Sequence, residues 1–245
     1  MRMIDMDVRE KALAQLKKKI KKELSSRDNL IIHALRMYDT LIKCFNLIYI
    51  QTFDWYSVNF PELCKKVDDP ETFLRLVSKY GERKNFANLK EYKEIVDKSL
   101  GIDLAEKDIK VIQKMAEFGL EIKSKSLELE KYIEELMVEE APNLTAITGP
   151  IVGARLIEKA GGLKRLSKMP ASTIQVLGAE KALFAHLRKK VPAPKHGVIF
   201  LIPEIRKAQK KARGKIARKY ANKIAIAARL DYFGKEKSKE NLEKE

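Results

Sequence analysis

The sequence predicts an all-α protein in which a long antiparallel coiled-coil domain precedes a compact helical domain. Two long segments carry apolar residues at alternating spacings of three and four, and only one short apolar run could form a strand. The charge is also divided. Residues 1–148 hold 26 Lys+Arg and 26 Asp+Glu, residues 149–235 hold 21 and 4, and residues 236–245 hold 3 and 4, so net charges of 0, +17 and −1 sum to +16. A block with that excess attracts polyanions, which favours RNA as a partner.

The first half begins with a basic amphipathic segment at residues 8–24, after which Ser25, Ser26 and Asp28 offer helix caps. The periodic run that follows has the spacing of a heptad seam. Its members are Ile31, Leu35, Tyr38, Ile42, Phe45, Tyr49 and Thr52. The sequence therefore predicts a long helix here.

A second seam lies in a segment without proline between residues 71 and 141. Its members are Ile112, Met115, Gly119, Ile122, Ser126, Leu129, Ile133 and Leu136. Breaks at Phe60-Pro61-Glu62, Asp69-Pro70 and Gly81 predict a small helical subdomain between two antiparallel helices. The seams could join two chains, which predicts a homodimer through the coiled coil, or they could satisfy each other within one chain.

The composition changes at Glu139–Asn143, where Gly, Pro and basic residues replace the balanced charges. We expect a coiled-coil domain with a helical insert at 1–142, a helical RNA- and protein-binding domain at 143–234, and a disordered tail at 235–245. The run Val198–Ile202 fits a strand, a buried helical turn or an extended connector. Residues 204–233 have a helical pattern that Gly214 could split.

The same sequence excludes several classes of protein. No apolar stretch approaches the ~20 residues that cross a bilayer, and the N-terminus lacks the layout of a signal peptide, so we expect no membrane association and a cytosolic or nuclear location. Cys44 and Cys64 have no neighbouring CxxC or His, which predicts buried free thiols. No metal cluster, cofactor loop or catalytic pair is evident, so we expect no cofactor, no metal and no enzymatic activity.

The candidate RNA-binding residues are mostly cations of the second half. Nine of them occur within a few predicted turns and could neutralise phosphates. They are Arg206, Lys207, Lys210, Lys211, Arg213, Lys215, Arg218, Lys219 and Lys223. A solvated helix surface is the alternative, although the acids that usually interleave such a run are absent. His196, after a proline-rich loop, could stack on an unpaired nucleotide or be an ordinary loop residue.

Three motifs resemble the Nop domain family, which comprises the scaffold proteins of box C/D RNA–protein particles and a related spliceosomal protein. The first motif comprises Gly178, Ala179, Glu180, Lys181, Ala182, Leu183 and Phe184. The other two are the stretch from Pro194 to Phe200, which includes Lys195 and His196, and the stretch from Arg213 to Arg218 with Ala221-Asn222-Lys223. Phe53-Asp54-Trp55-Tyr56 and Asn59–Leu63 are similar to the family's coiled-coil domain.

The resemblance implies an all-α scaffold that self-associates through its coiled coil and recognises a composite surface. That surface is a box C/D guide RNA folded as a kink-turn together with its kink-turn-binding protein. Glu180 and Lys181 would lie where RNA and protein meet, His196 near the RNA, and the cations of 206–219 along its stem. Methyl transfer to ribose 2′-hydroxyls in such particles belongs to fibrillarin, a separate partner that the scaffold positions.

The chain departs from the family pattern at its N-terminus. Family members usually carry a preceding domain that docks fibrillarin, whereas the predicted coiled-coil domain begins almost at Met1. The resemblance therefore leaves direct docking of fibrillarin open and keeps the binding of RNA and kink-turn protein. It places an archaeal protein in the cytoplasm and a eukaryotic one in the nucleolus or nucleus. The alternative function is a coiled-coil structural protein whose basic half anchors nucleic acid without specificity.

Overall fold

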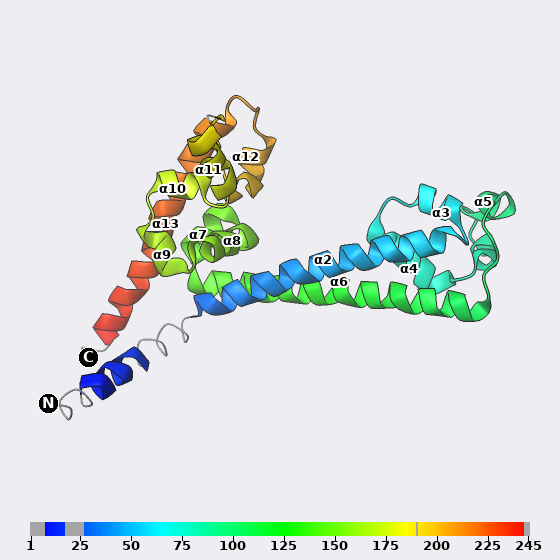
Figure 1. The fold of residues 1–245 in the computed structure, drawn as a ribbon, viewed down its shortest axis with the longest axis horizontal. Coiled ribbons are helices and arrows are strands. Elements are labelled where there is room, and N and C mark those ends of the chain that lie inside the picture. The colour runs from blue at the N-terminus through cyan, green and yellow to red at the C-terminus, as the bar shows by residue number, and fades with distance from the viewer. Residues whose placement is uncertain (1–7, 18–26, 190, 243–245) are drawn as a thin grey trace. The chain divides into compact units, whose positions relative to one another are not determined.

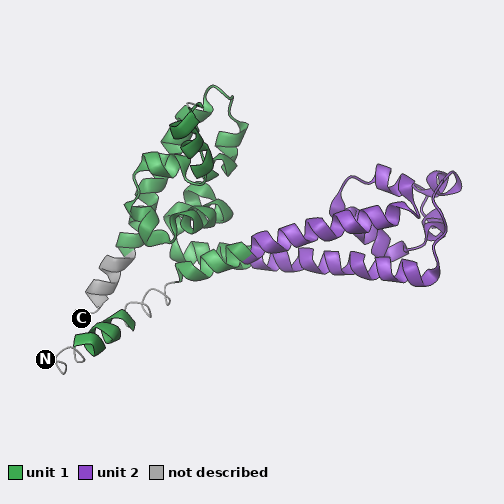
Figure 2. Cartoon of the chain, in the orientation of Figure 1, with its two compact units in different colours: residues 1–36, 130–245 green, residues 37–129 purple. Residues whose placement is uncertain are grey.

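The computed structural model describes residues 8–17, 27–189 and 191–242, with the backbone alone for 235–242, and it confirms the all-α class. Helices account for its regular structure, and no strand occurs in the described ranges (Figure 1). The chain forms two compact units, one of residues 1–36 and 130–245 and the other of residues 37–129 (Figure 2). No helix in the described part of the chain is long and apolar enough to cross a bilayer.

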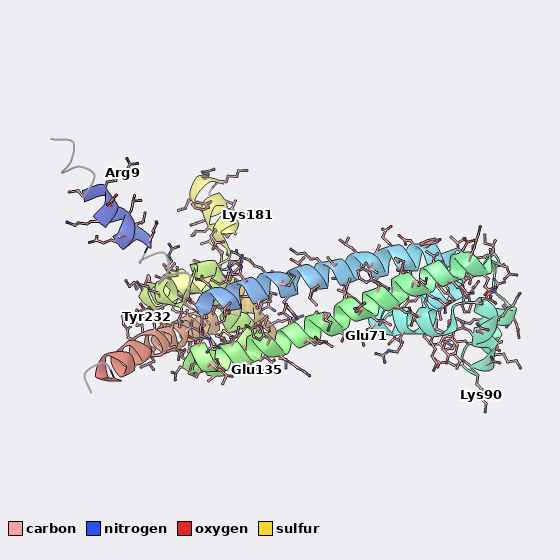
Figure 3. The ribbon with its side chains drawn as sticks, turned by 90° about the horizontal axis from the view of Figure 1, so that it is seen from below. Arg9, Glu71, Lys90, Glu135, Lys181 and Tyr232 are labelled. Atoms are coloured by element: carbon pink, nitrogen blue, oxygen red, sulfur yellow. The ribbon has the colours of Figure 1, made fainter. Side chains whose placement is uncertain are left out.

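Two long helices dominate the first half, α2 (Asp28–Ser57) and α6 (Glu106–Glu140). They run antiparallel in the 37–129 unit, because Phe45 lies beneath the amino group of Lys123 while Ile48 lies against Gly119, earlier in α6. A Cβ atom on Gly119 would lie 3.2 Å from Ile48 and 2.9 Å from Leu74, so glycine permits this close approach. Charged side chains such as Glu135 remain exposed along α6 (Figure 3).

Most of both predicted seams is buried or half-buried. Met115 is the exception, because its side chain is 41% exposed while Ala116 beside it is fully buried. The cause is α4 (Pro70–Tyr80), which covers α6 on the side of Gln113 and Ala116; the amide of Gln113 donates to the carbonyl of Ser78 at 2.9 Å. The buried stripe of α6 is therefore rotated at this end, and Met115 faces outward.

The predicted subdomain between the long helices consists of α3 (Pro61–Lys66), α4, a 3₁₀ helix η1 (Arg83–Asn88) and α5 (Lys93–Asp97). Its core is aromatic: Phe73 and Phe86 are fully buried and contact neighbouring rings edge-on. The buried Tyr56 hydroxyl donates to the carbonyl of Gly81 at 2.6 Å, and burial raises its pKa. Cys44 and Cys64 are free thiols and half-buried, and burial raises the pKa of Cys64 to about 12.

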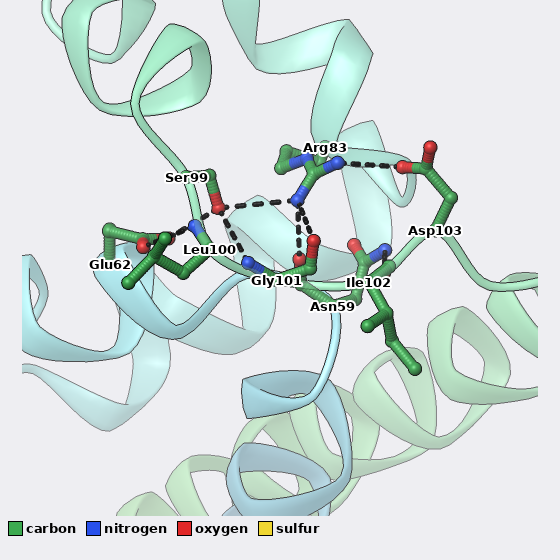
Figure 4. Close-up of polar contacts among 8 residues, drawn as sticks. All are labelled: Asn59, Glu62, Arg83, Ser99, Leu100, Gly101, Ile102 and Asp103. Atoms are coloured by element: carbon green, nitrogen blue, oxygen red, sulfur yellow. Dashed lines mark hydrogen bonds and ion pairs between the residues drawn. The ribbon is translucent and has the colours of Figure 1, made fainter.

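A polar network around Arg83 fixes the loop before α6 (Figure 4). The Arg83 guanidinium donates to the carbonyl of Gly101 and contacts the Asp103 carboxylate at 2.7 Å. Glu62 accepts from the Ser99 hydroxyl at 2.5 Å and from the N–H of Leu100 at 2.9 Å. The loop is thereby tied to α3 and η1 by charge-assisted hydrogen bonds.

The unit of residues 1–36 and 130–245 contains the ends of α2 and α6 and the whole second half. Its helices are α7 (Pro142–Thr148), α8 (Pro150–Ala160), α9 (Leu163–Lys168), α10 (Ala171–Val176), α11 (Glu180–Lys189), η2 (Val198–Leu201), α12 (Pro203–Lys207) and α13 (Arg213–Leu242). The sequence predicts Asp28 as a cap for its own helix, α2. In the structure its carboxylate accepts the N–H of Leu163 at 2.8 Å, at the start of α9. Ser25 and Ser26 lie outside the described residues.

Asp231 of α13 is buried and holds the start of α7. Its carboxylate accepts the backbone N–H groups of Asn143 and Leu144 at 3.0 and 2.8 Å, and the Asn143 amide at 2.7 Å. These donors are the unpaired N–H groups of a helix N-terminus, where a negative charge is favourable. Two segments 88 residues apart are thus joined by one side chain.

The structure decides three details of the second half that the sequence left open or assigned differently. Val198–Leu201 is a 3₁₀ helix, which settles the alternatives for that run. The helical segment of 204–233 is broken at residues 208–212, and Gly214 lies inside the first turn of α13. The helix α13 extends to Leu242, into the predicted tail, since nothing in its sequence before that residue stops a helix. The compact units divide at 36/37 and 129/130, so the boundary at 142/143 stays a prediction.

Candidate nucleic-acid interface

The end of α10 and the loop before η2 are joined by backbone hydrogen bonds. The N–H of Gly197 donates to the carbonyl of Gln175, and that of Val198 to the carbonyl of Leu177, each at 2.8 Å. The Gln175 side-chain amide donates to the carbonyl of Lys195 at 2.8 Å. Residues 195–198 of the 194–200 motif are therefore fixed against residues that lie just before the 178–184 motif.

Glycines permit this contact. A Cβ atom on Gly197 would lie 2.0 Å from the carbonyl oxygen of Leu177, which is too close for any side chain. Gly178 has a φ of +86°, a conformation that glycine adopts without strain, and a Cβ there would lie 2.4 Å from Val198. The two family motifs are thus side by side because each supplies a glycine at the crossing point.

His196 belongs to a stack of three side chains. Its ring is parallel to that of Phe200, with centroids 4.5 Å apart and an interplanar angle of 12°. The guanidinium carbon of Arg213 lies 5.3 Å from the Phe200 centroid. Burial, together with the positive charge of Arg213, lowers the pKa of His196 below its usual value of 6.5, so the imidazole is neutral at neutral pH.

Arg213 is also held by backbone carbonyls. Its Nε donates to the carbonyl of Ala208 at 2.9 Å and its Nη2 to that of Arg206 at 3.3 Å. It therefore fastens the 208–212 connector to the first turn of α13. This structural role distinguishes it from Arg218, which the sequence treats as equivalent and which is exposed.

The 178–184 motif forms the start of an exposed helix. Glu180 closes the turn, because its carboxylate accepts the N–H of Gly178 at 2.6 Å. No residue of α11 is buried, and the apolar side chains of Phe184 and Leu187 are 56% and 69% exposed. Lys181, labelled in Figure 3, is exposed on the same helix. The helix α11 thus presents apolar groups and a cation together.

The predicted cations do not form one straight row, because they are distributed over α11, the loop before η2, α12, the connector at 208–212 and the start of α13. All of them except the half-buried Arg213 are exposed: Lys181, Lys195, Arg206, Lys207, Lys210, Lys211, Lys215, Arg218 and Lys219. The aliphatic stem of Lys195 lies 3.8 Å from the position of a Cβ on Gly214, so it crosses the first turn of α13. Lys195 and Arg213 therefore bring the loop and the basic helix to one place.

Two residues important to this geometry were missed by sequence reasoning. Phe200 ends the 194–200 motif but was not predicted to be a site residue, and Gln175 lies outside the three motifs. Gln175 and Lys195, whose hydrogen bond joins the two segments, are twenty residues apart, so no local sequence pattern indicates this contact.

The described residues offer no obvious small-molecule chemistry. They contain no group of three His, Cys, Asp or Glu side chains that could hold a metal ion. A pocket of about 280 Å³ lies between α7 and α13. Its lining is almost entirely apolar and includes Ala146, Ile147, Ile226 and Leu230, with Lys223 as the charged member.

Comparison with known proteins identifies relatives along nearly the whole chain. Residues 37–245 match the family model described as "Nop: snoRNA binding domain, fibrillarin". An uncharacterized NOP5 family protein of Methanocaldococcus jannaschii is 46% identical over 239 residues, which cover 93% of this chain and 58% of that protein. Nucleolar protein 58 of Homo sapiens is 37% identical over 222 residues, which cover 86% of this chain and 42% of that protein.

A crystal structure of a fibrillarin/Nop5p complex contains a chain that is similar at 32% identity and a TM-score of 0.47, covering 92% of this chain and 69% of that one. The chain spans about half the length of the curated relatives it matches.

Proposed function

This chain belongs to the Nop family, and from that premise we propose that it is a non-catalytic scaffold of a box C/D RNA–protein particle. It would bind a kink-turn guide RNA together with the kink-turn-binding protein and support fibrillarin-dependent 2′-O-methylation of RNA.

The observation that carries the proposal is the crossing of the two family motifs at Gly178 and Gly197. It joins an exposed helix with apolar side chains, suited to a protein partner, to a loop and basic turn suited to RNA. A composite partner needs both kinds of surface in one place, because neither the RNA nor the protein alone then satisfies the whole site. Residues 185–193 separate the two motifs in the sequence, and the hydrogen bonds of Gly197 and Val198 bring them together.

The roles of the residues follow from their exposure. Phe184, Leu187 and Lys181 on α11 would contact the kink-turn-binding protein and the adjoining RNA. Lys195, Arg218 and the exposed cations of α12 and the connector would contact phosphates. His196, neutral and already stacked on Phe200, would lie close to the RNA as an aromatic surface rather than as a charge.

Self-association through the 37–129 unit is part of the same proposal. Val111, Met115 and Phe118 occur at spacings of four and three, so they lie on one face of α6, and they are 45%, 41% and 50% exposed. Exposed apolar stripes of this kind are typical of protein interfaces. We assign this stripe to the homodimer contact.

A gel-shift titration tests the proposal. The chain is titrated against a box C/D kink-turn RNA with and without its kink-turn-binding protein, at low and physiological salt. Binding at physiological salt that requires the preformed RNA–protein complex supports the scaffold. Equal and strongly salt-dependent binding to unrelated duplexes would instead support the alternative, a coiled-coil structural protein with a non-specific basic domain.

A further inference from the structure

A second cationic surface lies on α9 and the middle of α13, apart from the candidate interface. Residues 159–179 contain four basic residues and no Asp or Glu. Three of the four are the exposed cations of α9: Lys164, Arg165 and Lys168. Arg229 is an exposed cation of α13.

One hydrogen bond brings these two helices' charges together. The Nε of Arg229 donates to the carbonyl of Ser167 at 3.3 Å, at the C-terminal end of α9. Lys168 is the next residue, and Lys164 lies one turn before it on the same face of the helix. The Arg229 guanidinium and the α9 lysines therefore belong to one surface.

The neighbouring carboxylates are engaged elsewhere. Glu158 contacts Arg36 at 3.2 Å and Lys159 at 3.4 Å. Asp231 is buried against the start of α7, and Asp28 accepts the N–H of Leu163 at the opposite end of α9 from Arg229. In the part of the chain that the structure describes, no ion pair is formed by Lys164, Arg165 or Lys168. Structural pairing therefore does not explain why the three cations are there.

The position of Arg229 on α13 relates this surface to the candidate interface. Arg218 and Arg229 are eleven residues apart, which is close to three full helical turns, so both point from the same face of α13. Their Cα atoms are separated by about 16 Å along the helix at about 1.5 Å per residue. A nucleic-acid backbone that passes Arg218 in the direction of the helix axis would reach the α9 surface.

We propose that the surface of Lys164, Arg165, Lys168 and Arg229 binds the phosphates of a helical arm of the same RNA, beyond the kink-turn. The inference rests on the proposed function. Cations that contact only phosphates add affinity without sequence preference, so this surface would hold any arm long enough to reach it. A short kink-turn would bind through the composite motif alone.

The test compares three RNAs and two double variants. One RNA is a minimal kink-turn, and the others carry one or the other arm extended by about ten base pairs, roughly one helical turn. The variant K164E/K168E is compared with K90E/K93E, a matched charge reversal at exposed lysines of the 37–129 unit. Affinities for each RNA bound to its kink-turn protein are measured from low to physiological salt, and thermal unfolding verifies that both variants fold.

We expect the wild-type chain to bind one extended RNA more tightly than the minimal one. K164E/K168E should abolish that gain and lower the slope of log affinity against log salt by about 0.9 for each lost phosphate contact. K90E/K93E should retain the gain. No gain from either arm, or an equal loss on the minimal RNA, would overturn the inference. Failure of the wild-type chain to bind the minimal RNA–protein complex would overturn the proposed function instead.

Discussion

A Cβ atom on Gly197 would lie 2.0 Å from the carbonyl oxygen of Leu177, and the next residue, Val198, donates its N–H to that same carbonyl. The lack of a side chain at Gly197 makes this hydrogen bond possible, because only glycine lets the two backbones approach so closely. The position of His196 and of the turn at Gly178 both depend on this crossing.

Replacing Gly197 by Ala should therefore separate the two motifs. We expect a loss of about 1–3 kcal/mol in the free energy of unfolding, typical of forced overpacking, and a larger loss of affinity for the RNA–protein complex than the stability change explains. Urea unfolding and gel shift measure the two effects. Gly234→Ala is the control, since a Cβ there meets nothing within 4 Å. Gly197→Ala with wild-type stability would contradict the crossing.

Arg213 and Arg218 should behave differently although they lie in one basic motif. Arg218→Ala removes an exposed cation, so we expect unchanged thermal stability and a salt slope lower by about 0.9 if it contacts a phosphate of a helical stem. Arg213→Ala also removes hydrogen bonds to the carbonyls of Ala208 and Arg206, and it should lower the melting temperature as well. Identical effects of the two substitutions on stability would refute the distinction.

The titration of His196 provides a pH test of the stack. Burial and the charge of Arg213 lower its pKa in the folded protein, so its NMR titration midpoint should lie below 6.5. The unfolded chain binds this proton first as the pH falls, so the stability contributed by the neutral ring is present above pH 6.5 and is lost as the pH falls through the lowered pKa. Phe200→Ala should raise the midpoint, since it exposes the ring. A midpoint at or above 6.5 in the wild-type protein would show that the ring is solvated.

Glu62 should make the 37–129 unit sensitive to acid. Burial alone would raise its pKa, but hydrogen bonds from Ser99 and Leu100 and the charge of Arg83 together lower it below 4.5. Because the pKa is lower in the folded state, the ionised carboxylate stabilises the fold at pH values above 4.5. This contribution is lost as the pH falls through the folded-state pKa. Glu62→Gln should reduce the pH dependence of urea unfolding between about pH 5 and 3. If the variant and the wild type lose stability in parallel, the network has no such role.

The exposed stripe on α6 provides a test of dimerisation. Met115→Glu with Phe118→Glu should convert a dimer to a monomer, because both side chains would place charges in an apolar contact. Analytical ultracentrifugation measures the mass, and thermal unfolding extrapolated to low concentration should change little, since both residues are exposed. Leu127→Glu is the control: Leu127 is also exposed on α6 but points about 180° away from Phe118. A monomeric wild-type chain would contradict the assignment of this stripe to a homodimer contact.

Asp231→Ala should destabilise the unit of residues 1–36 and 130–245. The substitution removes the buried acceptor of the N–H groups of Asn143 and Leu144. A hydrogen bond to a charged group contributes about 1.5–3 kcal/mol to the free energy of unfolding. We expect the melting temperature to fall, whereas Asp97→Ala, at an exposed carboxylate of the other unit, should have little effect. Equal melting temperatures would show that α7 does not need its cap.

The sequence by itself determined the all-α class, the two long helices, the partition of charge and the family motifs. Each of these is a local property: heptad spacing predicts which face of a helix is apolar, and a run of cations without acids is visible in any segment. The same spacing did not distinguish the exposed Met115 from the buried residues of the seam, because a repeat does not reveal that α4 covers the neighbouring face of α6.

Tertiary structure decided what depends on contacts between distant segments. The carboxylate of Asp28 caps α9, more than a hundred residues away, and Asp231 caps α7. Arg213 fastens a connector that the sequence presents as continuous helix. The crossing of Gly197 with Leu177 joins the two halves of the candidate interface. Hydrogen bonds and close packing over such separations are selected by the whole fold, so the sequence named most residues of the candidate interface, while their arrangement came only from the folded chain.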